Sequence, residues 1–229
     1  MYERTGDERW ADAWRESADR LWSQWRERVW EQDLYGRNVR YLGSAHGFAA
    51  NVRALSRGDL LDDARRAELE ARTMAVALEF AQRKGELVQW PAVVDDASTS
   101  EVRTQWCHGA PGIVASLATI AVEEDALTEL LVAGGELTWR AGPLVKGPGL
   151  CHGTAGNGYA FLKLFERTGD ELWLERARAF AMQAIEQVER SRLEHGRGRF
   201  SLWTGDPGVA VFLNGCLTTT AALPTLDGD

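Results

Sequence analysis

The amino-acid sequence predicts an all-α protein whose helices form a double ring, an α/α toroid. Two observations predict this fold. A glycine-rich motif recurs along the 229 residues, and each copy is followed by an apolar stretch. The segments further on are amphipathic, and a buried helix followed by a half-exposed helix, repeated, gives an inner and an outer ring. An α-solenoid is the alternative arrangement, and convergence of the motifs at one end of the inner helices favours the ring.

Four copies of the glycine-rich motif align. They are residues 43–50 (GSAHGFAA), 105–112 (QWCHGAPG), 149–156 (GLCHGTAG) and 202–208 (LWTGDPG). If His46, His108, His152 and Thr204 are equivalent, the copies lie 62, 44 and 52 residues apart. Each interval is long enough for two helices and their loops.

The segments between the motifs predict the two kinds of helix. Residues 113–120 (IVASLATI) and 159–164 (YAFLKL) are apolar nearly all round, which is typical of buried inner helices. Residues 171–190 carry apolar positions such as Trp173, Ala177 and Phe180 between charges. That pattern predicts an amphipathic outer helix.

A sharper repeat relates the start of the chain to its middle. Residues 2–10 (YERTGDERW) match residues 165–173 (FERTGDELW) at an offset of 163. The later copy follows a motif and its inner helix, whereas an inner helix before the first copy would have to precede residue 1. We therefore expect residues 1–229 to form a single toroid domain that is truncated at its N-terminus.

Composition bears on the classes of partner. The net charge of −8 argues against nucleic acid. The apolar runs are shorter than the roughly 18 residues that a membrane span needs. The first residues contain no apolar signal segment, so a cytoplasmic protein is expected.

The cysteines indicate ligands rather than a disulfide framework. Three cysteines are an odd number, and the expected compartment is reducing. Cys107, Cys151 and His152 lie in the glycine-rich turns and supply the thiolate and imidazole ligands that zinc prefers. Buried thiols packed between helices, with histidines capping helix N-termini, are the alternative. Cys216 is expected to be a small buried thiol.

The motifs resemble those of the lanthionine synthetase C-like family. Residues 106–109 (WCHG) and 149–153 (GLCHG) are similar to its two metal motifs, and residues 43–47 (GSAHG) to its Gly-x-Ala-His-Gly segment. The end of the chain resembles its last repeat, and the order of the motifs agrees. The resemblance implies two concentric rings of seven helices around a zinc ion. About the last four of seven helical-hairpin repeats would be present here, an incomplete ring.

Residue by residue, the resemblance implies specific roles. Cys107, Cys151 and His152 become the Zn²⁺ ligands, His46 takes the position of an acid/base histidine, and Arg103 that of an active-site arginine. No residue of this chain matches the family's catalytic aspartate, which lies in the N-terminal half.

His108 stands where many lantibiotic cyclases carry tyrosine. A histidine there, followed by APG, is more similar to the glutathione-associated eukaryotic members. The implied reaction adds a cysteine or glutathione thiol to dehydroalanine or dehydrobutyrine and forms a thioether. His46 or His108 could return a proton, and Arg103 could stabilise enolate charge. The implied partners are glutathione or a dehydrated peptide, and a dehydratase.

Two alternatives to thioether formation stay open, and one of them is not an enzyme. The chain could be a catalytically inactive zinc- or glutathione-binding module from a truncated gene. A helical-toroid carbohydrate enzyme is less favoured, because that chemistry needs two carboxylates and the turns carry Cys and His, with Asp206 the main acidic exception. An incomplete ring would also expose apolar surface, so self-association is expected.

Overall fold

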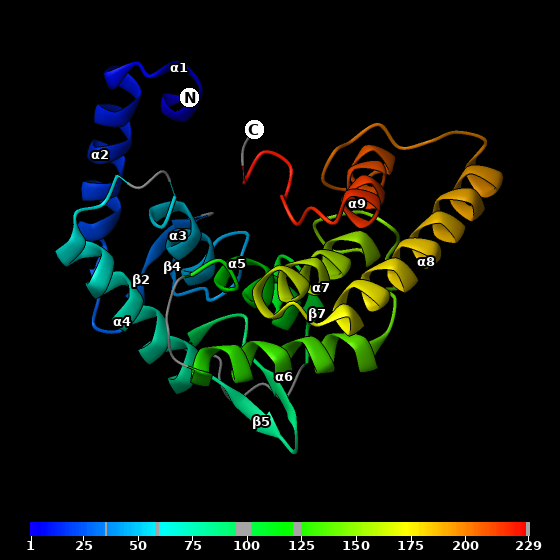
Figure 1. The fold of residues 1–229 in the computed structure, drawn as a ribbon, viewed down its shortest axis with the longest axis horizontal. Coiled ribbons are helices and arrows are strands. Elements are labelled where there is room, and N and C mark those ends of the chain that lie inside the picture. Colours follow the sequence, from blue (N-terminus) through cyan, green and yellow to red (C-terminus); the bar gives the residue numbers. More distant parts are fainter. Residues whose placement is uncertain (35, 58–59, 95–101, 121–124, 228–229) are drawn as a thin grey trace.

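The structure is a computed structural model that describes residues 1–34, 36–57, 60–94, 102–120 and 125–227. Its helices lie in two layers (Figure 1). The outer helices are α2 (Glu8–Ser23), α4 (Asp63–Glu79), α6 (Asp125–Ala141) and α8 (Glu171–His195). The inner helices are α3 (Phe48–Leu55), α5 (Ala110–Leu117), α7 (Thr154–Thr168) and α9 (Asp206–Thr218), and a short α1 (Tyr2–Thr5) precedes them.

The two layers follow an arc. Each inner helix packs against the next, α3 on α5, α5 on α7 and α7 on α9, while α6 and α8 cover them from outside. Figure 1 shows α2 and α4 on one side of this arc, α6 below and α8 on the other side. The helical, two-layer prediction is therefore confirmed, whereas closure into a ring and the number of repeats stay predictions.

Burial separates the layers as the apolar patterns predicted. α5 is buried along its whole length, and α7 is buried from Thr154 to Leu164. α8 buries one face, which includes Trp173, Ala177 and Phe180, and exposes the rest. The inner helix expected at residues 113–120 begins earlier, at Ala110, because the helix starts directly at the motif, with Pro111 in its first turn.

Four short antiparallel hairpins accompany the helices in the described residues, and the sequence did not predict them. They pair β1 (Trp25–Arg26) with β2 (Val29–Trp30), β3 (Gln32–Leu34) with β4 (Arg37–Val39), β5 (Gln82–Lys84) with β6 (Leu87–Gln89), and β7 (Thr104–Gln105) with β8 (His108–Gly109). Strands of two or three residues are too short to show an alternating apolar pattern.

The repeat between the start and the middle of the chain is confirmed in atomic detail. Gly6 ends α1 with φ 64° and Gly169 ends α7 with φ 68°, the left-handed conformation that glycine adopts without strain. Asp7 and Asp170 then cap the next helix through a side-chain oxygen that accepts a backbone N–H. Similar sequences thus make similar helix-to-helix corners.

The glycines of the motifs allow each loop to lie directly against the inner helix that follows. A Cβ added to Gly112, Gly156 or Gly208 would lie 1.8, 1.8 or 2.1 Å from the carbonyl oxygen six residues earlier. The same loops supply acceptors for the first helical N–H groups: in α7, Thr154 and Ala155 each donate to a loop carbonyl at 3.0 Å. Loop and helix N-terminus therefore form one rigid unit.

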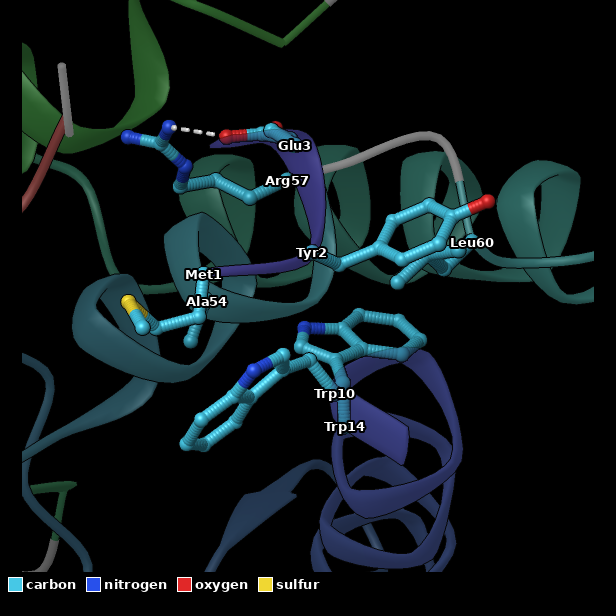
Figure 2. Close-up of a pocket in the computed structure, with 8 residues that line it drawn as sticks. All are labelled: Met1, Tyr2, Glu3, Trp10, Trp14, Ala54, Arg57 and Leu60. Carbon is cyan, nitrogen blue, oxygen red and sulfur yellow. Dashed lines mark hydrogen bonds and ion pairs between the residues drawn. The ribbon is translucent and has the colours of Figure 1, made fainter. Parts of the chain in front are cut away.

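The first outer helix borders an apolar pocket of about 470 Å³. Figure 2 shows Trp10 and Trp14 of α2 facing Ala54 of α3, with the ion pair between Glu3 and Arg57 above them. Trp10 is 44% exposed. The self-association expected from exposed apolar surface stays a prediction.

In the described part of the chain, no helix combines the length and apolar character that a membrane crossing requires.

Gly156→Ala should destabilise the fold by about 3 kcal/mol, because the new methyl group would overlap the Leu150 carbonyl. Gly6→Ala is the matched control, since its Cβ would meet nothing within 4 Å and only the left-handed φ opposes it. That control should cost about 1 kcal/mol. Urea unfolding of both variants measures the difference, and equal costs would contradict the close packing of loop on helix.

Candidate metal centre

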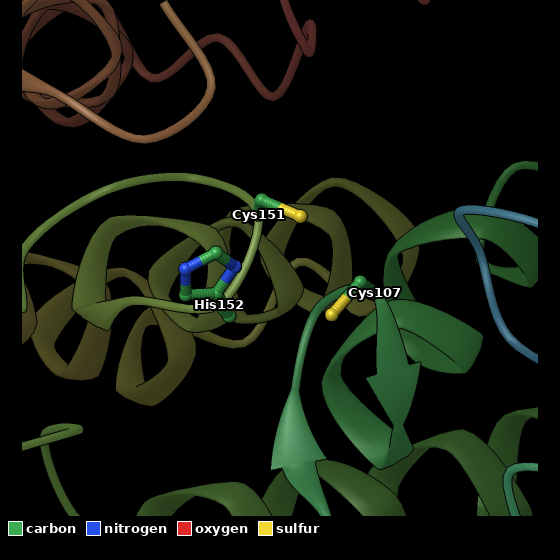
Figure 3. A group of neighbouring side chains, drawn as sticks. All are labelled: Cys107, Cys151 and His152. Atoms are coloured by element: carbon green, nitrogen blue, oxygen red, sulfur yellow. The ribbon is translucent and has the colours of Figure 1, made fainter. Parts of the chain in front are cut away.

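Two loops bring Cys107, Cys151 and His152 together. Cys107 lies in the tight turn that joins β7 to β8, directly before α5. Cys151 and His152 lie in the turn that leads into α7. Figure 3 shows the three side chains converging from these turns, and their ligand atoms all lie within 4.8 Å of one another.

Backbone hydrogen bonds between successive loops hold this geometry. The N–H of Cys107 donates to the carbonyl of Cys151 at 2.9 Å, and the N–H of Cys151 donates to the carbonyl of Trp203 at 2.8 Å. These three residues occupy the same position in three copies of the motif. Equivalent points of neighbouring repeats are thus joined directly, which places the two sulfur atoms side by side.

The donor set fits a metal ion of the zinc type. Two thiolates and one imidazole are preferred zinc ligands, with bonds of about 2.3 and 2.0 Å. Tetrahedral geometry with such bonds separates ligand atoms by roughly 3.7 Å, which the observed limit of 4.8 Å accommodates with small side-chain rotations. Three protein ligands leave one position open for water or a substrate.

The two cysteines hold their protons unequally. A hydrogen bond from the Cys107 thiol lowers the pKa of Cys151 well below its ordinary value, and His152 lowers it further against the opposing effect of burial. The same hydrogen bond, together with burial, raises the pKa of Cys107. Without a metal the pair therefore loses its first proton far more readily than its second, and Cys151 is the more acidic thiol.

Two histidines and a tyrosine lie beside the cysteines. The ring centroids of His46 and His108 are 5.9 Å apart, and Tyr41 lies 5.6 Å from His108 and 6.2 Å from His46. Burial, and then the charges of His46 and Arg103, lower the pKa of His108. The structure thus gathers His46, His108 and Arg103 around the metal-ligand candidates, and His108 is neutral at neutral pH.

Sequence reasoning missed three residues of this neighbourhood. Tyr41 belongs to no recognised motif and lies near the histidines because the backbone of residues 41–42 caps α3. Lys146 and Arg199 line a very small pocket, about 10 Å³, beside His152 and add positive charge there. Both lie in loops just before a motif, and position in the repeat was the signal that could have identified them.

The remaining candidates lie elsewhere. Cys216 is the small buried thiol that was predicted: it is 4% exposed on α9, and burial raises its pKa to about 12. His195 is the last residue of α8, where its ring contacts the Ser191 carbonyl at 2.9 Å. Asp206 forms an ion pair with Arg192 at 2.9 Å.

The fold and the site define the class: a two-layer helical protein with a Cys-Cys-His group at the N-termini of its inner helices. A comparison with protein families identifies the chain more narrowly. Residues 6–227 match the family described as Lanthionine synthetase C-like protein, and the chain belongs to this family.

Individual relatives agree with this assignment. The chain is 41% identical over 111 residues to LanC-like protein GCL1 of Arabidopsis thaliana. This alignment covers 45% of this chain and 25% of that protein. It is 38% identical over 120 residues to Glutathione S-transferase LANCL1 of Danio rerio, in an alignment that covers 49% of this chain and 28% of that protein. These alignments span only about a quarter of each relative's length.

A solved structure shares the fold. Nisin cyclase superposes with a TM-score of 0.64 at 15% identity, over 94% of this chain and 58% of that one. At this identity the likeness concerns the fold alone. The family resemblance expected from the motifs is therefore confirmed by sequence and by fold.

The wild-type protein should bind about one zinc per chain, and Cys151→Ala should lose it, because two ligands cannot replace three. Cys216→Ala is the matched control: it also removes a cysteine thiol, but one outside the ligand group. Elemental analysis of the purified proteins measures the metal. Zinc retained by Cys151→Ala, or lost by Cys216→Ala, would contradict the assignment of ligands.

After the metal is chelated, Cys151 should react with iodoacetamide faster than the other cysteines at about pH 6.5. Its lowered pKa keeps it ionised below the usual thiol value of about 8.5, and reactivity should fall only as the pH drops through that lowered pKa. Cys216 should stay unmodified because its pKa is raised. Peptide mass mapping identifies the alkylated cysteine, and equal labelling of all three would contradict the proton arrangement.

Proposed function

We propose that the chain binds zinc through Cys107, Cys151 and His152 and forms thioethers, adding a glutathione or cysteine thiol to dehydroalanine or dehydrobutyrine. The observation that carries the proposal is the Cys-Cys-His group, within 4.8 Å, in a member of this family. Bound there, zinc supplies the positive charge that keeps a substrate thiol ionised at neutral pH.

The two histidines divide the proton transfers. His108 has a lowered pKa and is neutral, so a ring nitrogen can accept the proton of the incoming thiol. The sulfur then bonds to the β-carbon of the dehydroamino acid, and the electron pair of the double bond moves toward the α-carbon and its carbonyl oxygen. His46, which is exposed, donates the proton that completes the α-carbon.

The cationic side chains orient the substrate. Arg103 lies close enough for its charge to act on His108, and its guanidinium can stabilise the enolate oxygen that forms during addition. Lys146 and Arg199 add positive charge beside His152, where they can attract the carboxylates of glutathione. The zebrafish relative named Glutathione S-transferase LANCL1 supports glutathione as the thiol.

A binding module without turnover is the second candidate. It is favoured by the short alignments, because the chain matches only about a quarter of the length of GCL1 and LANCL1. Such a module would bind zinc and glutathione through the same residues but would leave the addition at its uncatalysed rate.

Zinc-loaded protein should accelerate the addition of glutathione to a dehydroalanine peptide, followed by mass spectrometry of the adduct. His46→Ala should lower the rate about 10²-fold, because a general acid contributes roughly that factor, and should keep its zinc. His195→Ala is the control, since this exposed histidine lies at the end of α8 and should leave the rate unchanged. An uncatalysed rate in zinc-loaded wild type would sink the enzymatic proposal and leave the binding module.

A further inference from the structure

A charged pocket lies at the opposite end of the inner helices from the metal centre. The metal-ligand candidates precede the N-termini of α5 and α7, whereas this pocket is lined from the C-terminal ends of α3 and α7. It has a volume of about 500 Å³. The lining side chains that matter here are Arg53, Arg57, Lys163, Glu166, Arg167 and Asp227.

Two of its cations are almost completely buried. Arg53 of α3 is 5% exposed and Lys163 of α7 is 4% exposed. Cations near a helix C-terminus are favourable at the surface, but burying them costs several kcal/mol unless an anion pairs with them. Two buried cations that face one pocket therefore require an anion between them.

Two carboxylates supply this negative charge: Glu166 Oε2 lies 3.0 Å from Lys163 Nζ, and Asp227, near the end of the chain, pairs with both buried cations. Asp227 accepts a hydrogen bond from Arg53 Nε at 3.0 Å and lies 3.4 Å from Lys163 Nζ and 3.8 Å from Arg57 Nη1. Burial raises the pKa of Asp227, but the charges of Arg53 and Lys163 outweigh it and hold that pKa below its usual value. An ionised group thus sits among three cations.

Asp227 reaches the pocket on a short segment rather than on a helix. Its own backbone N–H donates to the Leu223 carbonyl at 2.9 Å, and its Oδ2 accepts from the Leu223 N–H at 2.8 Å. Arg57 also donates to the Leu226 carbonyl at 2.7 Å. Leu223 is buried and Leu226 packs against the core, so these side chains anchor the segment. The Asp227 carboxylate lies outside any helix, so it can leave the cations without disturbing one.

The Asp227 carboxylate does not satisfy the buried Arg53 completely. Arg53 Nη1 is buried and has no hydrogen-bond partner among the described residues. A guanidinium offers five N–H donors, while a carboxylate offers two acceptor oxygens that Arg53, Lys163 and Leu223 already use. A tetrahedral oxyanion has more acceptor oxygens and more charge, and arginine is well suited to it.

We propose that this pocket is a binding site for a phosphate group, either inorganic phosphate or the phosphate of a small molecule, and that Asp227 occupies it in the absence of that ligand. Binding of phosphate would displace the Asp227 carboxylate from Arg53 and Lys163. The site is separate from the metal centre and does not depend on the thiol-addition chemistry.

Titration calorimetry tests the proposal. Inorganic phosphate is titrated into wild type and into Asp227→Asn, at a constant ionic strength set with sodium chloride. Asp227→Asn should bind phosphate at least about tenfold more tightly, because the competing carboxylate is gone. The double variant Asp227→Asn/Arg53→Met should lose this gain. Glycerol 3-phosphate run in parallel distinguishes an organic phosphate, which would bind more tightly than phosphate, from inorganic phosphate.

Asp19→Asn is the matched control, since it also removes a carboxylate from an arginine, Arg65, at the exposed surface. It should leave phosphate binding unchanged. Equal phosphate affinity of wild type and Asp227→Asn would overturn the proposal. So would a gain that persists without Arg53, or one that disappears in Asp227→Asn/Cys151→Ala, which would place the anion at the metal centre.

Hydrogen exchange on the wild-type protein covers the case in which Asp227→Asn does not fold. The Leu223 amide donates to Asp227 Oδ2, so displacement of the carboxylate by phosphate should accelerate its exchange. Sodium chloride at the same ionic strength should not. An unchanged Leu223 exchange rate at every phosphate concentration would overturn the proposal.

Discussion

The architecture depends on the close backbone contact between each glycine-rich loop and its neighbours. Hydrogen bonds from Cys107 to Cys151, and from Cys151 to Trp203, join equivalent positions of successive repeats. Glycines at positions such as Gly156 allow the loops to lie against the helices that follow, where any Cβ would overlap a carbonyl. Because the metal-ligand candidates belong to the bonded residues themselves, the contact that stabilises the inner layer also fixes the geometry of the site.

The inner helices also explain why the two ends of the molecule differ in charge. Their N-termini carry partial positive charge and face the loops that hold the thiols, which favours a thiolate. Their C-terminal ends carry partial negative charge, and there the buried cations Arg53 and Lys163 gather around Asp227. One set of parallel inner helices thus presents an anionic sulfur site at one end and a cationic pocket at the other.

Two histidines in equivalent repeats have different environments. His108 is partly buried, next to Arg103 and His46, and its pKa is lowered. His46 lies at the exposed edge of the same cluster, with Tyr41 packed near both rings. The repeat supplies two copies of the imidazole, and burial distinguishes them.

The sequence by itself determined the alternation of buried and amphipathic helices, the metal-ligand candidates and the family. It also determined the repeat that places Asp7 and Asp170 at equivalent helix starts. These features follow from periodicity, local capping and motifs, which act over a few residues. Only the tertiary structure decided the short hairpins, the position of Tyr41 and the pocket in which Asp227 meets Arg53, 174 residues earlier. The physical reason is that such contacts depend on how distant segments pack, and no local pattern of side chains specifies that packing.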